Sequence, residues 1–306
     1  MSVDDTAADI KSMKIRGAGK IARAGAKALS DFADSYEGTG IQTFLADLEK
    51  AKRALLESRP TAVSLWNGVC FTLRGVAGTK DVGEAAALVA SNAEKFIVSS
   101  ENAVKVIGEI GAKRVQDGDT LLTICNSSAA ISVMKTAHRQ NKNIKVYATE
   151  TRPWRQGILT ARELDAEGID TTLVVDSAVR SVMKKVDKVF VGADTVTSHG
   201  SLINKVGTSH VALAAHEARV QFYVCAETYK FSPMTLFGDM VTIEERPSSE
   251  ISAPGELPET VKIYNPVFDS TPAAYIDAII TELGMMSPGA VFGVMTHQLG
   301  YSAMQP

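Results

Sequence analysis

Apolar residues recur at intervals of three and four positions along the first third of the chain, where Ala, Lys and Glu are also frequent. The stretches IARAGAKALSDFADSY (21–36) and TFLADLEKAKRALLES (43–58) are clear examples. This spacing places the apolar side chains on one face of a helix. The pattern predicts amphipathic helices from about residue 5 to residue 113.

The pattern changes near residue 118 to short runs rich in β-branched residues, separated by stretches with helical spacing. Two of these stretches, SAAISVMKTAHRQ (128–140) and VALAAHEAR (211–219), are predicted helices. Alternation of strands and helices is typical of an α/β fold with a mostly parallel sheet and crossover helices. The predicted strands are LLTIC (121–125), IKVYATE (144–150), TTLVV (171–175), KVFVGAD (188–194) and QFYVCAE (221–227).

The change of pattern also predicts a domain boundary. The turn sequence QDGD (116–119) follows the last helical stretch, so we expect a helical N-terminal domain at 1–115 and a second domain at 116–306. Two units also fit the length, since domains usually have about 100–200 residues. The segment ERPSSEISAPGELPE (245–259) is rich in Pro, Ser and Glu and is predicted to be an extended surface loop.

Charge narrows the kind of partner that the chain could bind. The sequence has 32 Lys and Arg against 35 Asp and Glu, which gives a formal net charge of −3. This balance provides no general attraction for nucleic acid or for an anionic membrane. We therefore expect neither as a partner, and a phosphate site must be local.

Cysteine and histidine spacing argues against a disulfide framework and against a structural metal. The three cysteines have no CxxC spacing, and the five histidines show no HExxH pattern. The N-terminus is polar and charged, and no run reaches the roughly 18 apolar residues that a membrane span needs. We therefore expect no metal and a reducing, cytoplasmic location.

Cys125 is the first candidate for chemistry. It ends the LLTIC run and is followed by Asn126, Ser127, Ser128 and Ala129, which open a predicted helix. A helix N-terminus lowers the pKa of a neighbouring thiol, and its backbone N–H groups suit a phosphate. The alternative is a buried cysteine that acts as a small apolar residue.

Asp194 is the second candidate, because ligands gather at the carboxyl ends of strands in open parallel sheets. It ends KVFVGAD, and a polar loop is predicted at 195–201. Asn204 and Lys205 then precede Gly207 and the next helix, so that an amide, an ammonium and a glycine-containing helix start could hold hydroxyls and a phosphate. A turn or a helix N-cap is the alternative role for Asp194.

Further cations occur at predicted helix starts and strand ends. Arg16 precedes small residues, but the segment lacks the GxxxxGK[ST] spacing of a Walker motif and no strand precedes it. Arg59 stands at a helix entrance, and Lys230 follows a strand. The alternatives are a tight helix start for Arg16 and solvent exposure for Lys230. The loop at 152–157 places two guanidinium groups beside an aromatic ring, which suits a ligand rim or a subunit contact equally.

Six segments in this order resemble one superfamily, and together they cover nearly the whole chain. The superfamily contains methylthioribose-1-phosphate isomerase, ribose-1,5-bisphosphate isomerase and the translation initiation factor 2B α, β and δ subunits. The segments are RGAGKIARA, RPTAV, TICNSSA, ETRPWRQG, VGADTVTSHGSLINKVGT and NPVFDSTPAAYI. The RGAG, ICNSS, GADTV and ETYKF contexts look most like the ribose-1,5-bisphosphate isomerases.

The resemblance implies a Rossmann-like second domain, a homo-oligomer built from dimers and commonly a hexamer, and a role in the salvage of nucleoside monophosphates such as AMP. It also implies that Cys125 and Asp194 are the catalytic pair. The substrate-binding residues that it implies are Arg16, Gly17, Ala18, Gly19, Arg59, Ser127, Ser128, Ala129, Asn204, Lys205 and Lys230.

The resemblance implies a phosphorylated pentose as the substrate, and this limits the chemistry. An aldose 1-phosphate cannot open to a free aldehyde, because its anomeric oxygen is esterified. A path that avoids this has Asp194 donate a proton to the ring oxygen while the Cys125 thiolate removes the C2 proton, which gives an enol phosphate. This proton chemistry requires no cofactor.

Two alternatives share the fold. A methylthioribose-1-phosphate isomerase generally reads RGAP and Cys-Asn-Thr-Gly, where this chain has RGAG and Cys-Asn-Ser-Ser. A regulatory protein of the initiation-factor type would need no catalytic thiol and carboxylate together.

Overall fold

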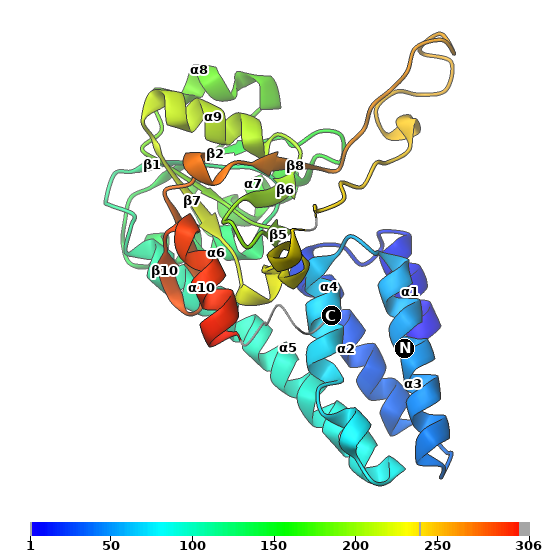
Figure 1. Cartoon of the computed structure of the whole chain (residues 1–306). Coiled ribbons are helices and arrows are strands. Elements are labelled where there is room, and N and C mark those ends of the chain that lie inside the picture. Colours follow the sequence, from blue (N-terminus) through cyan, green and yellow to red (C-terminus); the bar gives the residue numbers. More distant parts are fainter. Residues whose placement is uncertain (1, 239, 300–306) are drawn as a thin grey trace. The chain divides into compact units, whose positions relative to one another are not determined.

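The computed structural model describes residues 2–238 and 240–299, and the chain divides into two compact units (Figure 1). The division falls between Ala103 and Val104, inside helix α5 (Val82–Ala112). The sequence pattern places the boundary later, after residue 115, where this helix has ended. The difference arises because the last turns of α5 contribute Ile107 and Ala112 to an apolar core of unit 2.

Unit 1 consists of helices, and it contains the amphipathic helices that the apolar spacing predicts. Its core is formed by apolar side chains that are spaced by helical turns, among them Ile21, Leu29, Phe44 and Leu65. The helices before α5 are α1 (Val3–Lys11), α2 (Ala18–Asp34), α3 (Ile41–Ser58) and α4 (Val63–Thr72).

Helices α2 and α4 pack closely because glycines stand at their contact. A Cβ atom added at Gly25 would lie 2.6 Å from Leu65 Cδ1, and one added at Gly68 would lie 3.2 Å from the Ala22 carbonyl oxygen. Ser64 at the start of α4 donates a hydrogen bond of 2.9 Å to the Ala18 carbonyl at the start of α2. The two helix N-termini therefore lie side by side.

Unit 2 contains a seven-stranded sheet with the order β10-β9-β7-β4-β1-β2-β3. All its neighbouring strands are parallel except β9 and β10, which confirms the predicted α/β class. The strands are β1 (Thr120–Thr123), β2 (Lys145–Thr149), β3 (Asp170–Val174), β4 (Lys188–Val191), β7 (Gln221–Cys225), β9 (Ala278–Thr281) and β10 (Gly284–Met286).

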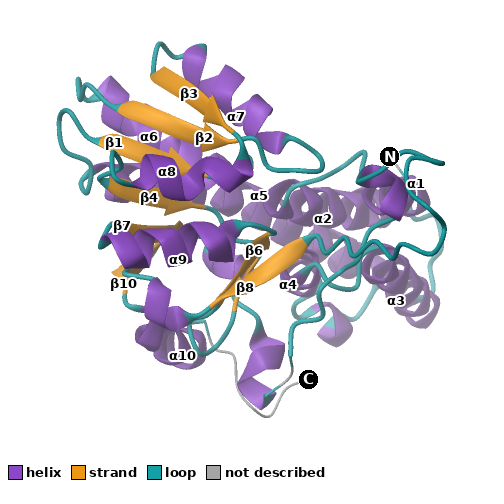
Figure 2. Ribbon diagram, turned by 90° about the horizontal axis from the view of Figure 1, so that it is seen from above, coloured by secondary structure: helices purple, strands orange, loops and turns teal. Residues whose placement is uncertain are grey.

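Helices cover both faces of this sheet, so that two apolar cores form (Figure 2). One face packs against α8 (Val179–Met183), α9 (Thr208–Ala218) and α10 (Val291–Gly293). The other packs against the end of α5, α6 (Ser128–Arg139) and α7 (Gln156–Asp165). A strand buried on both faces needs a nearly continuous apolar run, which is what the inner strands β1, β4 and β7 show.

A second, antiparallel sheet of three strands corrects one prediction. The order is β5 (Thr195–Val196), β6 (Leu202–Lys205) and β8 (Phe268–Thr271). The predicted polar loop at 195–201 is therefore wrong at its first two residues, which form β5, while residues 197–201 are the turn that leads into β6. The hairpin turn is closed by a hydrogen bond of 2.9 Å from the Thr197 N–H to the Ser201 carbonyl.

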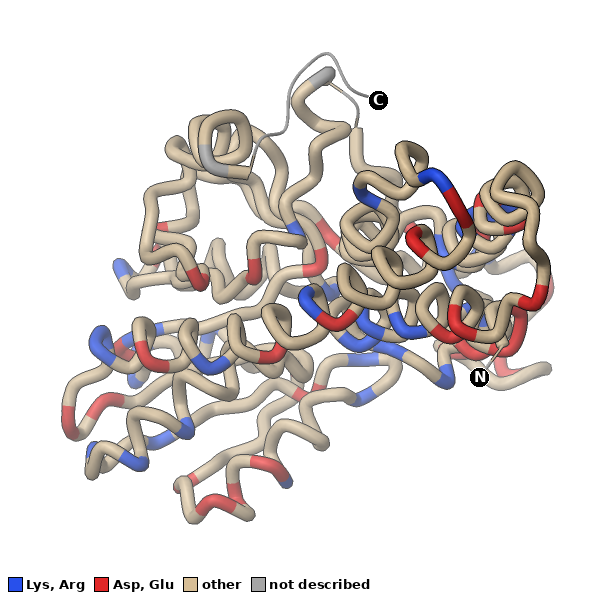
Figure 3. The backbone as a smooth tube through the Cα atoms, turned by 90° about the horizontal axis from the view of Figure 1, so that it is seen from below, with Lys and Arg blue, Asp and Glu red and all other residues tan. Residues whose placement is uncertain are grey.

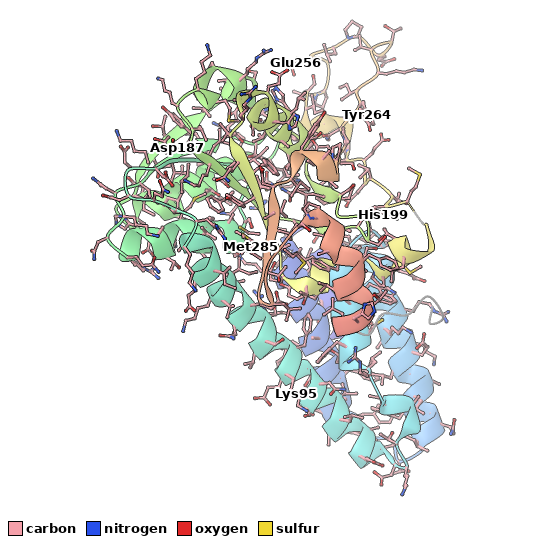
Figure 4. The ribbon with its side chains drawn as sticks, turned by 60° about the vertical axis from the view of Figure 1, so that its left-hand side comes forward. Lys95, Asp187, His199, Glu256, Tyr264 and Met285 are labelled. Carbon is pink, nitrogen blue, oxygen red and sulfur yellow. The ribbon has the colours of Figure 1, made fainter. Side chains whose placement is uncertain are left out.

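The segment predicted as an extended surface loop carries little regular structure. Between residues 245 and 259 it contains one short 3-10 turn, Ser248–Glu250, and most of its side chains are exposed. Figure 4 labels Glu256 on this segment and Tyr264 just beyond it. The 152–157 loop docks against the segment, since Trp154 Nε1 donates a hydrogen bond of 2.7 Å to Glu250 Oε2. The ring of Trp154 thus has a partner within its own chain.

Charged residues of both signs are interspersed along the chain (Figure 3). This arrangement agrees with the near balance of 32 basic and 35 acidic residues. In the described ranges, no helix combines the length and the apolar character that crossing a bilayer requires.

Candidate active site

Cys125 lies directly beyond the carboxyl end of β1, in an unusual backbone conformation. Its φ angle is 68°, which is the left-handed region that L side chains other than Asn and Asp seldom adopt. Such a residue costs about 1–3 kcal/mol and persists only where the surrounding structure holds it. The side chain is half-buried. The strained position at a strand end is typical of a functional residue.

Two buried threonines hold the backbone on either side of this residue. The Cys125 N–H donates to Thr151 Oγ1 at 2.9 Å, and Thr160 Oγ1 donates to the Cys125 carbonyl oxygen at 2.6 Å. Asn126 Nδ2 donates to Thr160 Oγ1 at 3.0 Å. Thr151 follows β2 and Thr160 is on α7, so three parts of unit 2 meet at Cys125.

Helix α6 begins three residues after Cys125, as the sequence predicts. Ser127 is its N-cap and accepts a hydrogen bond of 3.4 Å from the Ala130 N–H. Ser128 is exposed and Ala129 is buried in the first turn. A Cβ atom added at Gly192 would lie 2.3 Å from Ser127 Oγ, so the segment after β4 lies directly against this helix start. Only glycine permits so close an approach.

Asp194 lies two residues beyond Gly192 and leads into β5. Its N–H donates a hydrogen bond of 3.1 Å to the Ile203 carbonyl, and the β5–β6 register pairs Thr195 with Ile203. Extension of this antiparallel register by one residue places Asp194 opposite Asn204. The alternative role of Asp194 as a helix N-cap is wrong, since a strand follows it. Asp194 is half-buried, and the amide of Asn204 donates a hydrogen bond of 3.0 Å to Thr208 Oγ1.

Lys205 ends β6 and Gly207 is the N-cap of α9, but this helix start already has an anion. Asp269 on β8 accepts hydrogen bonds from the Gly207 N–H at 2.7 Å and from the Ser209 N–H at 3.1 Å. The expectation that a phosphate uses these amides is therefore wrong, because a carboxylate of the chain takes them. Lys205 is buried, with its Nζ 5.2 Å from the centre of the Phe268 ring.

Lys230 is buried rather than exposed, which excludes the solvent-exposed alternative. Its Nζ lies 2.7 Å from Glu227 Oε2, and the two side chains are 7% and 4% exposed. Burial by itself raises the pKa of Glu227, but the charge and hydrogen bond of Lys230 outweigh it, so the pKa lies below its usual value. Tyr229 Oη donates to Glu227 Oε1 at 2.9 Å. The ammonium is thus held at the end of β7 by a buried carboxylate.

The strand order brings these segments together. Strand β4 lies between β1 and β7, and the carboxyl ends of parallel strands meet at one edge of a sheet. Cys125, Asp194 and Lys230 follow these three neighbouring strands. The segments after Asp194 and Lys230 are joined directly, because the Ser232 N–H donates a hydrogen bond of 2.9 Å to the carbonyl of Val196 in β5. A thiol, a carboxylate and an ammonium therefore share this edge of unit 2.

The predicted residues of unit 1 form a separate group at one end of its helices. Arg16 precedes Gly17, whose φ angle of 92° starts α2, and Arg59 ends α3 four residues before α4. The hydrogen bond between Ser64 and Ala18 holds the starts of α2 and α4 side by side. Arg16 and Arg59 therefore belong to neighbouring turns of the same unit.

The chain matches the model of the initiation factor 2 subunit family over residues 14–288. The chain belongs to this family.

Named relatives of the chain include two kinds of isomerase and an initiation factor. The ribose 1,5-bisphosphate isomerase of Archaeoglobus fulgidus is 49% identical over 98% of this chain and 95% of the relative. A putative methylthioribose-1-phosphate isomerase of the same organism is 38% identical over 94% of this chain and 88% of the relative. The structure of the Pyrococcus horikoshii OT3 translation initiation factor eIF-2B has a TM-score of 0.81 and 32% identity, over 94% of this chain and 97% of that one.

The same site contains groups that the sequence pattern did not single out. Asp269, Thr151 and Thr160 all contact predicted site segments, yet no local sequence pattern marks any of them. Glu227 could have been noticed in the sequence, because an acidic residue three positions before Lys230 can form an ion pair with it. In residues 2–238 and 240–299, no cluster of three or more His, Cys, Asp or Glu side chains is placed to hold a metal ion.

Asp269 makes a test of stability against pH possible. Burial raises the pKa of its carboxyl from 3.8 to about 6, against the hydrogen bonds from Gly207 and Ser209. The folded protein thus keeps a proton that the unfolded chain releases between these values. This bound proton stabilises the folded state by up to roughly 3 kcal/mol. The stabilisation is fully present below pH 3.8 and is lost as the pH rises through about 6.

We therefore expect the free energy of unfolding of the wild type, relative to Asp269→Asn, to fall as the pH rises from 4 to 7. Urea unfolding of both proteins at several pH values measures this difference. A difference that does not change with pH contradicts the raised pKa. The comparison between the two proteins removes the contributions of other acidic groups.

Proposed function

We propose that this protein is an isomerase that converts ribose 1,5-bisphosphate into ribulose 1,5-bisphosphate. The observation that carries the proposal is the placement of Cys125, Asp194 and Lys230 on neighbouring strand ends, in a chain that is 49% identical to a ribose 1,5-bisphosphate isomerase. Identity to the putative methylthioribose-1-phosphate isomerase of the same organism is lower, at 38%. The bisphosphate is therefore the favoured substrate.

The two catalytic residues exchange protons with the sugar in two stages. Cys125 as a thiolate removes the C2 proton, and Asp194 donates a proton to the ring oxygen as its bond to C1 breaks. The C1–C2 double bond of an enol phosphate forms. The Cys125 thiol then returns a proton to C1, and Asp194 takes the proton of the C2 hydroxyl as the ketone forms. Both residues regain their starting states.

The other predicted residues bind and orient the substrate. The backbone N–H groups of Ser128 and Ala129 head α6, where the first amides of a helix have no partner within the helix and attract an anion. Asn204 lies opposite Asp194 and suits a sugar hydroxyl. We assign the phosphates to these amides and to the cations Arg16, Arg59, Lys205 and Lys230.

Direct assay of the product tests the proposal. The purified protein is incubated with ribose 1,5-bisphosphate, and ribulose 1,5-bisphosphate is detected by chromatography and mass spectrometry after borohydride reduction. Parallel reactions contain methylthioribose 1-phosphate. Turnover of the thiosugar alone would identify the other isomerase, and no turnover of either sugar together with specific binding to initiation factor 2 would indicate a regulatory protein.

Loss of a phosphate-binding cation should raise the KM for the bisphosphate. A charge-assisted hydrogen bond contributes about 1.5–3 kcal/mol, which corresponds to roughly a tenfold to hundredfold change in affinity. We expect this effect for Arg16→Ala, Arg59→Ala and Lys230→Met. Steady-state kinetics with ribose 1,5-bisphosphate measure it, and ribose 1-phosphate should be less affected by loss of the cation that holds the 5-phosphate.

The Lys230 variant needs a second substitution as a control, because its removal leaves the buried Glu227 carboxylate without its cation. Glu227→Gln combined with Lys230→Met removes both charges together. Arg53→Ala, at an exposed position of α3, is the matched control in unit 1. Wild-type kinetics in all three cation variants would show that the proposed phosphate site is wrong.

The proposed activity also suggests where and in what form the protein works. We place it in the cytoplasm, in salvage of nucleoside monophosphates, and as a homo-oligomer built from dimers. Size-exclusion chromatography with light scattering measures the oligomeric state, and a monomer at assay concentration would contradict the last point.

A further inference from the structure

We propose that Thr160 and Thr151 are positioning residues for catalysis, which aim the Cys125 thiol by fixing the backbone on both sides of it. The inference rests on the proposed function, in which Cys125 takes the C2 proton. It concerns two side chains that touch the backbone of Cys125 and are fully buried. Neither needs to contact the substrate.

The geometry of the two hydrogen bonds carries the argument. The N–H of Cys125 belongs to the peptide plane before its Cα atom, and its carbonyl belongs to the plane after it. Thr151 accepts from the first group at 2.9 Å, and Thr160 donates to the second at 2.6 Å. The orientations of these two planes determine φ and ψ, and these angles set the direction of the Cα–Cβ bond. The two threonines therefore determine where the thiol points.

Both hydroxyl groups can donate and accept at this place, and Thr151 Oγ1 also lies 3.4 Å from Thr149 Oγ1. Thr160 Oγ1 gives its proton to the Cys125 carbonyl and accepts from Asn126 Nδ2 at 3.0 Å. Thr151 Oγ1 gives its proton to the Thr149 carbonyl at 3.2 Å and accepts from Cys125. Each hydroxyl thus donates one bond and accepts another. Valine has the same shape but can do neither.

We call the pair Thr151 and Thr160 the threonine clamp. It is needed because the backbone conformation of Cys125 that it holds is unfavourable. Cys125 has a φ angle of 68° and Thr151 a φ angle of 64°, both in the left-handed region. Thr151 is held in turn by Asp176, whose two carboxylate oxygens accept from the N–H groups of Thr151 at 2.8 Å and Arg152 at 2.7 Å. Without the hydroxyls, Cys125 can relax toward ordinary backbone angles, which turns its thiol away from the substrate.

The experiment compares Thr160→Val and Thr151→Val with Thr160→Ser, which keeps the hydroxyl. A misplacement of about 1 Å at a reacting group can cost roughly a hundredfold in rate, so we expect kcat to fall by about tenfold to a hundredfold in either valine variant. KM should stay close to the wild-type value, since the substrate contacts remain. Thr160→Ser should restore most of kcat.

Thr171→Val is the matched control, because Thr171 Oγ1 also donates to a backbone carbonyl, that of Ile169 at 2.9 Å, away from Cys125. Alkylation by iodoacetamide, with the modified peptide identified by mass spectrometry, reports the reactivity of the Cys125 thiol independently of turnover. We expect a changed alkylation rate at Cys125 in the two valine variants and the wild-type rate in Thr160→Ser and Thr171→Val.

The outcomes separate this inference from the proposed function. Wild-type kcat in both valine variants, in a protein that Cys125→Ser inactivates, overturns the positioning role alone. An equal loss of kcat in Thr160→Ser or in Thr171→Val also overturns it. Full activity of Cys125→Ser instead contradicts the proposed function. If one valine variant does not fold, the other tests the same clamp from the opposite side of Cys125.

Discussion

Replacement of Cys125 by serine should lower kcat by about 10²–10⁴, the usual contribution of a general base, while KM changes little. Serine has nearly the same size, so the left-handed backbone and its two hydrogen bonds can remain. Its hydroxyl, however, is far less ionised than a thiol near neutral pH and cannot take the C2 proton efficiently. Initial rates of ribulose 1,5-bisphosphate formation measure the effect.

Cys70→Ser is the matched control for this prediction. Cys70 is half-buried on α4, and burial raises the pKa of its thiol, so it is not poised as a base. This variant should keep the wild-type kcat. A normal kcat in Cys125→Ser would remove that residue from the mechanism and leave the role of the strained position unexplained.

Replacement of Asp194 by asparagine should also lower kcat by about 10²–10⁴. The amide fits the same place opposite Asn204, but it has no acidic proton for the ring oxygen and cannot accept one from the C2 hydroxyl. Substrate binding should change less than turnover. Steady-state kinetics measure the split, with Asp170→Asn at an exposed position of β3 as the control.

Deuterium exchange gives this variant a second measurement. In heavy water, exchange of the C2 hydrogen without product formation would show that Cys125 still acts when Asp194 cannot, so the two residues would have separate steps. Loss of both exchange and turnover would indicate that proton removal and ring opening are coupled. A wild-type kcat in Asp194→Asn contradicts the assignment of the acid.

The phosphate site illustrates how local patterns mislead. Gly207 before a helix resembles an anion site in sequence, because free amides head every helix. In the structure Asp269, far along the chain, already accepts from those amides. The sequence also left the burial of Lys230 open, since a lysine after a strand is usually exposed. Its burial beside Glu227 depends on how β7 and its flanking turn pack, which no local pattern records.

The hairpin after Asp194 also depends on a partner that local sequence does not reveal. The residues at 195–201 are polar and short, so local propensity favours a loop. They form a strand and a turn because β6 also pairs with β8, whose residues 268–271 lie more than sixty positions later. A partner so distant supplies the hydrogen bonds that the short segment cannot make alone.

The sequence by itself determined the main elements and the candidate chemical groups. Apolar spacing reports which face of a helix or strand is buried, so the helices of unit 1, the strands β1, β2, β3, β4 and β7 and their order of alternation were predictable. Cys125 and Asp194 became candidates because each stands at the end of such an apolar run, just beyond β1 and β4. Tertiary structure alone decided the order of strands in the sheet, the left-handed backbone of Cys125 and the threonines that hold it. Those features depend on hydrogen bonds and packing between residues far apart in the chain, and local propensity carries no information about such contacts.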